Sequence, residues 1–579
     1  MDAKNWVSVV LFTLAFTGFY AIILLPYSSN GVLGELRSLI PDILTAWHST
    51  APKALQEEAA GRVILSPNLT TCHQSLSDAD VPVYCCPPKR ESEEAFIDFQ
   101  FPDPSSLTLR IRRPAHLVDD DYIAKYNKAL SIMKSLPYED PRNFMRQANM
   151  HCIYCTGAYN QQHSNSLLKI HRSWLFFPWH RMMLYFHERI LASLIGDDTF
   201  ALPFWNWDSP AGMVIPRMYM NGSFRDPERD ASHLPPQVAD IDFDYVESGL
   251  DPQDQIATNV AFMYNQMVSG AKKTELFMGC PYKPGEEGFC DGPGTIELAP
   301  HNALHTWVGS NLNPERENLG AFYSAARDPI FYAHHSNIDR LWEVWRGLQG
   351  AKAEIHDPDW LDSYFFFHDE KSQLVRIKIR DVLDITKLGY DFQKVDLPWL
   401  NARPKPAVSP KIARYMLKTR EDDQNVLPRH TTDKVGFSFG PEGRTLDTAV
   451  RVKVPRPKIL RTKKEKEEEE EVLLVYGIDI KKDVYVKFDV YVNAIDETRI
   501  GPESREFAGT FVNMRHGVRL VMNRGDATVK RKTNLKLGIS ELLEDLEADG
   551  DESIWVTLVP RGGTGLHISI DGIRIEYMR

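Results

Sequence analysis

The chain has 579 residues, a hydrophobic fraction of 43% and a formal net charge of −12. This length allows two or more domains, and this apolar content is enough for a core in each. The acidic balance argues against nucleic acid as a partner, because phosphate backbones are bound by positively charged surfaces.

The N-terminus carries an uncharged apolar run, residues 6–25. Its length matches the roughly 20 residues that span a bilayer. Residues 1–27 are therefore predicted to be a signal peptide or a signal anchor, the latter attaching the chain to a membrane through residues 6–25. Residues 28–65 are interpreted as a stalk or pro-segment. Sequons at Asn68 and Asn221 also indicate a compartment in which proteins are glycosylated.

Helical periodicity dominates the middle of the chain, and apolar–polar alternation dominates its end. Helices are predicted over residues 119–136, 142–150, 176–195 and 255–267. Residues 401–471 read as a linker that ends in a charge run. Strands are predicted over residues 472–480, 483–492, 507–514, 553–560 and 566–577. The predicted fold class is α+β: a mainly helical, four-helix-bundle domain at 66–400, followed by a β-sandwich-like domain at 472–579.

Two histidines, His301 and His305, stand four residues apart, so on a helix they share one face. A third, His335, comes from a later segment rich in aromatic residues. Three imidazoles on packed helices make a cup for a metal ion. No glutamate follows His301, so the HExxH pattern of zinc hydrolases is absent from the sequence here.

An earlier group of histidines, His151, His171 and His180, repeats this arrangement. A single such histidine is more often a core residue than a ligand, but two groups of three are hard to explain as packing. Ligand sets made only of nitrogen favour copper, because calcium, magnesium and manganese prefer carboxylates and structural zinc usually recruits thiolates. The sequence therefore predicts two copper ions.

Around these histidines the sequence resembles the two copper regions of plant polyphenol oxidases, the catechol oxidase and tyrosinase family. The resemblance runs from about Cys72 to the C-terminus and is carried by the segments HCIYC, NSLLKIHRSWLFFPWHR, FALPFWNWDSP, HNALHTW, FYSAARDPIFYAHHSNIDRLW and KFDV. It implies a coupled dinuclear (type 3) copper centre that binds dioxygen. The implied ligands are His151, His171 and His180 for copper A, and His301, His305 and His335 for copper B.

The resemblance implies an enzyme that oxidises o-diphenols to o-quinones and reduces dioxygen to water, with small phenols and dioxygen as partners. It also implies latency: the domain at 472–579 would shield the copper site until an activating protease displaces it. Within that domain, Val472–Leu474 is the segment predicted to fill the phenol pocket. An oxygen carrier similar to haemocyanin stays open as the alternative, and access for a phenol would distinguish the two. An inactive structural protein is disfavoured because all six ligand positions are filled.

Seven cysteines are present, and the sequence alone does not fix their pairing. The resemblance implies the disulfides Cys72–Cys86 and Cys85–Cys152, while Cys280 and Cys290 would close a loop that typical relatives lack. It also implies a thioether between Cys155 and His171. From the residues alone, a buried free thiol and a thiolate ligand remain alternatives for Cys155.

Three more residues receive roles from the resemblance. Phe322 would gate the dicopper site from above, or else be an ordinary core residue. Glu297 and Asn302 would hold a water that accepts the proton of a monophenol, with the glutamate as base. We therefore expect hydroxylation of monophenols in addition to catechol oxidation. The alternative is that Glu297 only holds helix geometry and Asn302 only bonds a loop carbonyl.

The N-terminus departs from the family in one respect. Many plant polyphenol oxidases begin with a serine-rich, basic plastid transit peptide, and this chain begins with the apolar run instead. We therefore expect the secretory pathway, ending in the vacuole or in a lumenal or membrane-anchored location, rather than the chloroplast thylakoid lumen.

Overall fold

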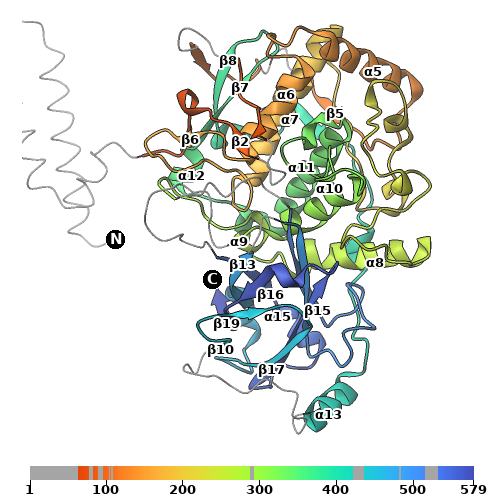
Figure 1. Ribbon diagram of the computed structural model, residues 1–579, viewed down its shortest axis with the longest axis vertical. Coiled ribbons are helices and arrows are strands. Elements are labelled where there is room, and N and C mark those ends of the chain that lie inside the picture. The colour runs from red at the N-terminus through yellow and green to blue at the C-terminus, as the bar shows by residue number, and fades with distance from the viewer. Residues whose placement is uncertain are drawn as a thin grey trace, which may run out of the picture. The chain divides into compact units, whose positions relative to one another are not determined.

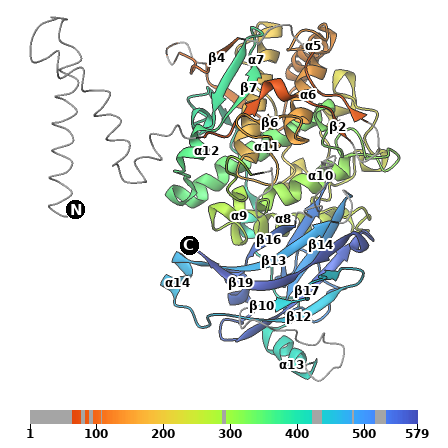
Figure 2. The same ribbon diagram turned by 60° about the vertical axis from the view of Figure 1, so that its left-hand side comes forward.

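The computed structural model describes residues 63–76, 82–88, 95–103, 105, 108–286, 292–420, 436–480, 484–514 and 532–579. The predicted signal or anchor segment and nearly all of the predicted stalk lie outside these residues. Residues 64–579 form one compact unit, in which helices gather in one part and strands in another (Figures 1 and 2). Within the described ranges, no helix has the length and apolarity needed to cross a bilayer.

The helical part is built around five α-helices whose ends follow local sequence signals. Asp119 and Asn143 cap the first two by accepting hydrogen bonds from backbone N–H groups. The third begins with Pro178 in its first turn and ends at Gly196, whose φ of +64° suits glycine. The helices are α5 (Asp120–Ser135), α6 (Phe144–Cys155), α7 (Phe176–Ile195), α10 (Asn302–Val308) and α11 (Ile330–Gln349).

Helix α7 is buried around almost its whole circumference, as expected of a central core helix. It packs against α5 and α11, while α8 (Pro252–Tyr264) and the π-helical turn η6 (Asn265–Ser269) complete the helical layer. Helix α6 continues five residues beyond its predicted end at Met150, so that it carries both His151 and Cys155.

A buried network of charges joins α7 and α11 to two short parallel strands, β5 (Arg110–Arg112) and β9 (Tyr390–Phe392). Asp339 accepts hydrogen bonds from Arg181 at 2.6 Å, from Arg112 at 3.0 Å and from the Tyr390 hydroxyl at 2.7 Å. Arg112 also pairs with Glu188 at 2.8 Å. Paired charges of this kind are tolerated in a core because each has a partner.

Short strands and disulfides attach the N-terminal segment to the helices. The strands β4 (Phe96–Asp98), β8 (Leu374–Lys378) and β7 (Tyr364–His368) form one sheet that the sequence analysis did not predict. The structure contains the disulfides Cys72–Cys86 and Cys85–Cys152, with Cα–Cα distances of 5.9 and 6.0 Å. Cys280 is also disulfide-bonded, and Cys290 lies outside the described residues.

The C-terminal part contains two antiparallel sheets that share one apolar core. One has the order β10-β19-β13-β18-β11 with β16 also on β13, and the other has the order β12-β17-β14-β15. The core draws on both, for example Leu473 and Ile573 from the first and Val452 and Phe488 from the second. The longer strands are β13 (Glu470–Ile480), β14 (Val486–Val492), β15 (Phe507–Asn513), β16 (Thr533–Gly538), β17 (Ser553–Arg561) and β19 (Gly572–Met578).

The predicted linker, residues 401–471, contains regular structure. Helix α13 (Pro410–Arg420) and the strands β10 (Gly436–Ser438), β11 (Arg444–Thr445) and β12 (Val450–Pro455) lie in it. β12 alternates buried valines with arginine and lysine, a pattern too short and too charged to be recognised as a strand. The charge run forms the exposed helix α14 (Lys463–Glu468), but Glu470 and Glu471 are buried at the start of β13.

The predicted pocket-filling segment, Val472–Leu474, lies inside β13. Leu473 belongs to the core between the two sheets and pairs with Ile575 of β19, so the prediction is wrong for Leu473. Val472 and Leu474, whose side chains point the other way along the strand, are also buried, so the continuous apolar run reflects burial of both faces of β13.

Candidate dicopper site

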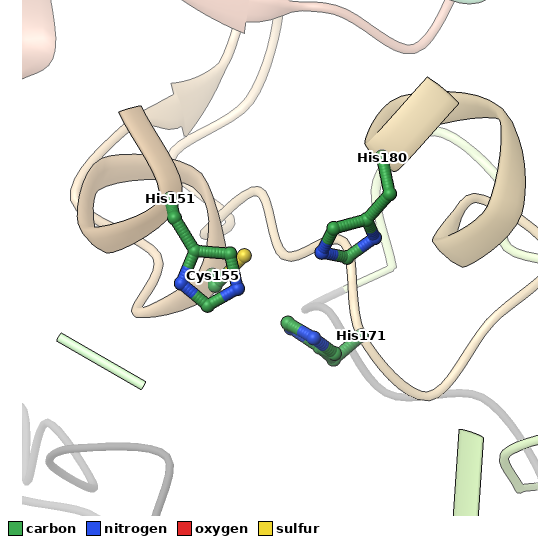
Figure 3. Close-up of side chains that lie close together, drawn as sticks. All are labelled: His151, Cys155, His171 and His180. Atoms are coloured by element: carbon green, nitrogen blue, oxygen red, sulfur yellow. The ribbon is translucent and has the colours of Figure 1, made fainter. Parts of the chain in front are cut away.

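The first histidine cluster, cluster A, gathers side chains from two helices and the segment between them. His151 and Cys155 lie one turn apart on α6, His180 lies in the first turns of α7, and His171 precedes α7. Figure 3 shows the three imidazoles and the Cys155 sulfur turned toward one another. One ligand atom from each of the four residues lies within 4.8 Å of the others.

The second cluster, cluster B, contains His301, His305, His334 and His335, which also lie within 4.8 Å of one another. His301 ends the π-helical segment η7 (Glu297–His301), His305 lies on α10, and the last two lie on α11. The Nε2 atoms of His305 and His335 are 3.3 Å apart. The clusters are neighbours, because the rings of His180 and His335 stack at a centroid distance of 4.2 Å.

Backbone carbonyls hold four of these imidazoles by their Nδ1 atoms. Phe322 O lies 2.9 Å from His151 Nδ1, Phe176 O 2.8 Å from His180, Glu297 O 3.2 Å from His301 and Leu319 O 2.7 Å from His305. A carbonyl can only accept, so Nδ1 carries the proton and the Nε2 lone pair is left for a metal.

The remaining ring atoms fit metal ligation. Among the described residues, the buried Nε2 atoms of His151, His180 and His301 have no hydrogen-bond partner. Burial lowers the pKa of all three imidazoles, that of His180 to about 3, which keeps them neutral. Neutral nitrogen donors in two adjoining cups suit a pair of copper ions.

His334 is the member of cluster B that the sequence analysis did not assign. It is buried, and neither ring nitrogen has a hydrogen-bond partner within the described part of the chain. Its neighbour His335 faces His305, whereas the His334 ring stacks on His301 at 5.6 Å and approaches Trp207 at 5.9 Å. On a helix, adjacent residues point in directions about 100° apart, so a sequence pattern cannot say which histidine enters the cup.

Cys155 is a buried free thiol in this structure, and burial raises its pKa well above the ordinary value. It lies in cluster A beside the histidines that the sequence analysis assigned to copper A. The structure therefore brings Cys155 and His171 together in one cluster.

Phe322 is 1% exposed and lies against cluster A. Its ring centroid is 4.4 Å from that of His171, and its carbonyl is the one that holds His151. A side chain in this position both packs and limits the space above the cluster.

Glu297 is not on the same regular helix as His301, because Ala299 between them has the extended angles φ −159° and ψ 136°. Its carboxylate instead accepts a hydrogen bond from the backbone N–H of Arg172, next to His171. Burial raises the pKa of Glu297 to about 8. A break in the helix and a contact with Arg172 thus place the carboxyl group, and a helical wheel predicts neither.

Asn302 connects the site to the C-terminal sheets. Its Oδ1 lies 2.9 Å from His301 Nδ1, and its Nδ2 donates to the carbonyl of Val512 at 3.3 Å. Val512 and Asn513 end strand β15, which packs on η7 and α10. The end of β15 therefore covers the site, and the sequence analysis missed this segment because alternation does not reveal what a strand end contacts.

Comparisons with known proteins agree with this geometry. Residues 141–348 match the common central domain of tyrosinase, 354–405 the polyphenol oxidase middle domain and 442–577 the chloroplastic polyphenol oxidase C-terminal domain. The chain is 48% identical to aureusidin synthase of Antirrhinum majus, covering 89% of this chain and 88% of that protein. It is 45% identical to a chloroplastic polyphenol oxidase of Malus domestica, covering 90% and 85%.

The chain belongs to the plant polyphenol oxidase family. It is a copper-dependent oxidoreductase of the catechol oxidase and tyrosinase type, and the prediction of a dinuclear type 3 copper centre is confirmed. The structure of latent apple tyrosinase superposes with a TM-score of 0.72 at 44% identity, covering 84% of this chain and all of that one. A latent aurone synthase superposes with 0.78 at 34% identity, covering 89% and 99%. The helical domain followed by a β-rich domain is thus the fold of latent polyphenol oxidases.

The expected secretory address is wrong. The apple relative and six others, 39–46% identical to this chain, are named as chloroplastic proteins. Apolar length reports only that a segment can enter a bilayer, and every bilayer accepts such a segment in the same way. The run at residues 6–25 therefore could not distinguish one membrane system from another.

Proposed function

We propose that this polyphenol oxidase hydroxylates monophenols as well as oxidising o-diphenols, and that the full-length chain is latent. The observation that supports both parts is the position of Asn302, which contacts His301 on one side and the end of β15 on the other. The proposed copper ligands are His151, His171, His180, His301, His305 and His335.

Copper, when bound, supplies the redox chemistry with dioxygen that the imidazoles alone lack. The chain's own residues fix the imidazole orientation, exclude bulk water and accept the substrate proton. A monophenol has a pKa of about 10 and must lose its proton before it can bind a metal as phenolate. The Glu297 carboxyl, through a water oriented by the Asn302 amide, is the proposed acceptor. Positive charge in the histidine cups would lower its pKa and favour the carboxylate form.

Replacing Asn302 by glycine tests this role. General-base assistance is typically worth roughly 10²–10⁴-fold, so the rate of tyramine hydroxylation should fall by a large factor while dopamine oxidation is retained. The measured quantity is the ratio of the two initial rates in the copper-loaded chain. An unchanged ratio would exclude the pair as proton acceptor.

The latent state is proposed to depend on the β-rich domain, which we place at residues 472–579 together with the strands at 436–455, after the catalytic domain at 66–400. An activating protease that cuts the connecting region is the proposed trigger, since exposed polar segments are preferred cleavage sites.

Phe322 is proposed to gate the access of bulky phenols. Phe322→Ala should then change the KM for bulky diphenols and leave the Tm of the protein nearly unchanged.

Two covalent and cellular features also remain proposals. A thioether between Cys155 and His171 would fix the imidazole of His171. Mass spectrometry of the reduced, digested protein should show their two peptides linked, and separate peptides would refute the bond.

Residues 6–25 are the proposed membrane anchor, and the names of the relatives support the chloroplast as the compartment. Fractionation of tagged protein between thylakoid membrane and soluble phase would test both.

A further inference from the structure

Arg172 lies beside cluster A, and the proposed mechanism gives its side chain no role. It follows His171 directly, and its backbone N–H donates to the Glu297 carboxylate. Its φ of +66° lies in the left-handed region, which is uncommon for a residue with a side chain. The residue in this left-handed conformation, at the edge of the site, is an arginine and not a glycine.

The guanidinium of Arg172 points toward the segment that covers the site. Its Nη2 donates to the side-chain oxygen of Asn513, the last residue of β15. The preceding residue, Val512, offers its carbonyl to the Asn302 amide. Two donors of the catalytic domain, one cationic and one neutral, thus bind two consecutive acceptors of the covering strand.

When the strand leaves, the Asn302 amide and the Arg172 guanidinium lose these two acceptors and are left as unpaired donors beside His301 and His171. The covering strand shows which groups these donors can bind: the Val512 carbonyl accepts from the asparagine beside His301, and the Asn513 side-chain oxygen accepts from the arginine beside His171. A guanidinium prefers a carboxylate to a neutral amide oxygen, because the carboxylate carries the opposite charge and its two oxygens can accept a bidentate pair of hydrogen bonds.

We infer that Arg172 is a specificity-determining residue that selects phenols carrying a carboxylate on a short side chain opposite the reacting hydroxyl groups. This inference rests on the polyphenol oxidase activity and on the covering role proposed for β15. The hydroxylated edge of the ring faces the two histidine clusters, and the carboxylate replaces the Asn513 oxygen at Arg172. A substrate with an ammonium group in the same place is disfavoured by like charge.

The experiment compares three diphenols of similar size in the full-length, copper-loaded chain, before and after limited trypsin treatment. They are 3-(3,4-dihydroxyphenyl)propanoate, neutral 4-ethylcatechol and cationic dopamine. Hydrogen bonds to charged groups contribute about 1.5–3 kcal/mol, so Arg172→Ala should lower kcat/KM for the carboxylate roughly 10- to 100-fold. After trypsin treatment, the kcat/KM for the neutral diphenol should change little, and that for dopamine should rise.

Three further variants separate specificity from folding. Arg172→Lys should keep part of the preference for the carboxylate, because the charge remains but the planar fork is lost. Arg172→Gly should lose the preference without loss of Tm, because glycine relieves the left-handed backbone. Arg225→Ala, which removes an exposed arginine elsewhere on the catalytic domain, should leave all three diphenols unaffected.

A binding measurement gives a readout that does not depend on turnover. Titration calorimetry of the trypsin-treated chain with 3-phenylpropanoate, which has no hydroxyl group to oxidise, should show a Kd that rises with Arg172→Ala, and phenethylamine should bind more tightly to that variant. An equal loss for all three diphenols, or no change in any of them, would overturn the inference. A wild-type chain that oxidises none of the three would instead overturn the assigned activity.

Discussion

At the scale of single residues, the site is defined by the hydrogen bonds that the Nδ1 atoms of the imidazoles make. Carbonyls of Phe322, Phe176 and Leu319 hold His151, His180 and His305 with Nε2 directed inward. A ligand that is already oriented pays little entropy on binding a metal, so each of these histidines contributes directly to affinity.

Replacing His305 by alanine should empty cluster B of copper and leave cluster A loaded, because His301 and His335, the two other proposed ligands, cannot complete the coordination of the second ion. Elemental analysis should find about one copper ion per chain in place of two. His187→Phe is the matched control: His187 is also a buried histidine, but it stacks on Tyr332 at 3.7 Å and belongs to neither cluster. Two copper ions in the His305 variant would remove this residue from the site.

The sequence predicted the clustered histidines because helical spacing and ligand chemistry are both local properties. It could not choose between His334 and His335, since both lie in a buried helix of the same character. Nor could it find the contact of Arg172 with Asn513, which are separated by more than half of the chain. Pairings of that kind depend on how two domains meet, and no periodic pattern encodes them.

At the scale of elements, α7, predicted at residues 176–195, begins and ends at those residues. The strongest apolar periodicity, a proline in the first turn and a glycine after the end coincide there. The strand β12 was missed because half of its residues are charged or proline and its partner, β17, lies about 100 residues away. The elements are held together by buried charges that the sequence shows only as scattered arginines and acids.

Asp339 is the centre of that network, and Asp339→Ala should destabilise the copper-free chain strongly. The substitution leaves the guanidinium groups of Arg112 and Arg181 buried with less compensating charge, and breaking a buried pair typically costs roughly 3–5 kcal/mol. In urea denaturation, this loss of stability should lower the midpoint concentration of the unfolding transition. Asp98→Ala, which removes a partly exposed partner of Arg376, should cost about 1 kcal/mol or less. Equal midpoints for the two variants would contradict a central role for Asp339.

At the scale of the whole molecule, the β-rich domain is bound to the helical domain by apolar and charged contacts together. Tyr485, Tyr491, Phe507 and Val512 belong to the same buried cluster as the helical core. The Tyr485 hydroxyl also donates to the carbonyl of Phe243 at 2.8 Å. These contacts hold the domain in place together with the chain connection, so weakening them should favour release even before a cut in the connecting region.

Lys487, in the KFDV segment, is the charged contact best placed to test this. It is 3% exposed, and its Nζ pairs with the Asp242 carboxylate of the helical domain at 2.9 Å and with Asp489 of its own strand at 3.5 Å. Lys487→Met would leave the Asp242 carboxylate buried opposite an apolar side chain, which disfavours the closed arrangement. The full-length, copper-loaded variant should therefore oxidise catechol several-fold faster than wild type before any proteolysis.

The control for this variant is Lys532→Met, because Lys532 pairs with Asp571 at 2.6 Å within the β-rich domain alone. It should leave the untreated rate unchanged. After trypsin treatment all three chains should converge on one catechol rate, since the active site itself is the same in each. If Lys487→Met lowers Tm but leaves the gap between untreated and trypsin-treated activity as wide as in wild type, the ion pair stabilises the fold without holding the covering strand in place.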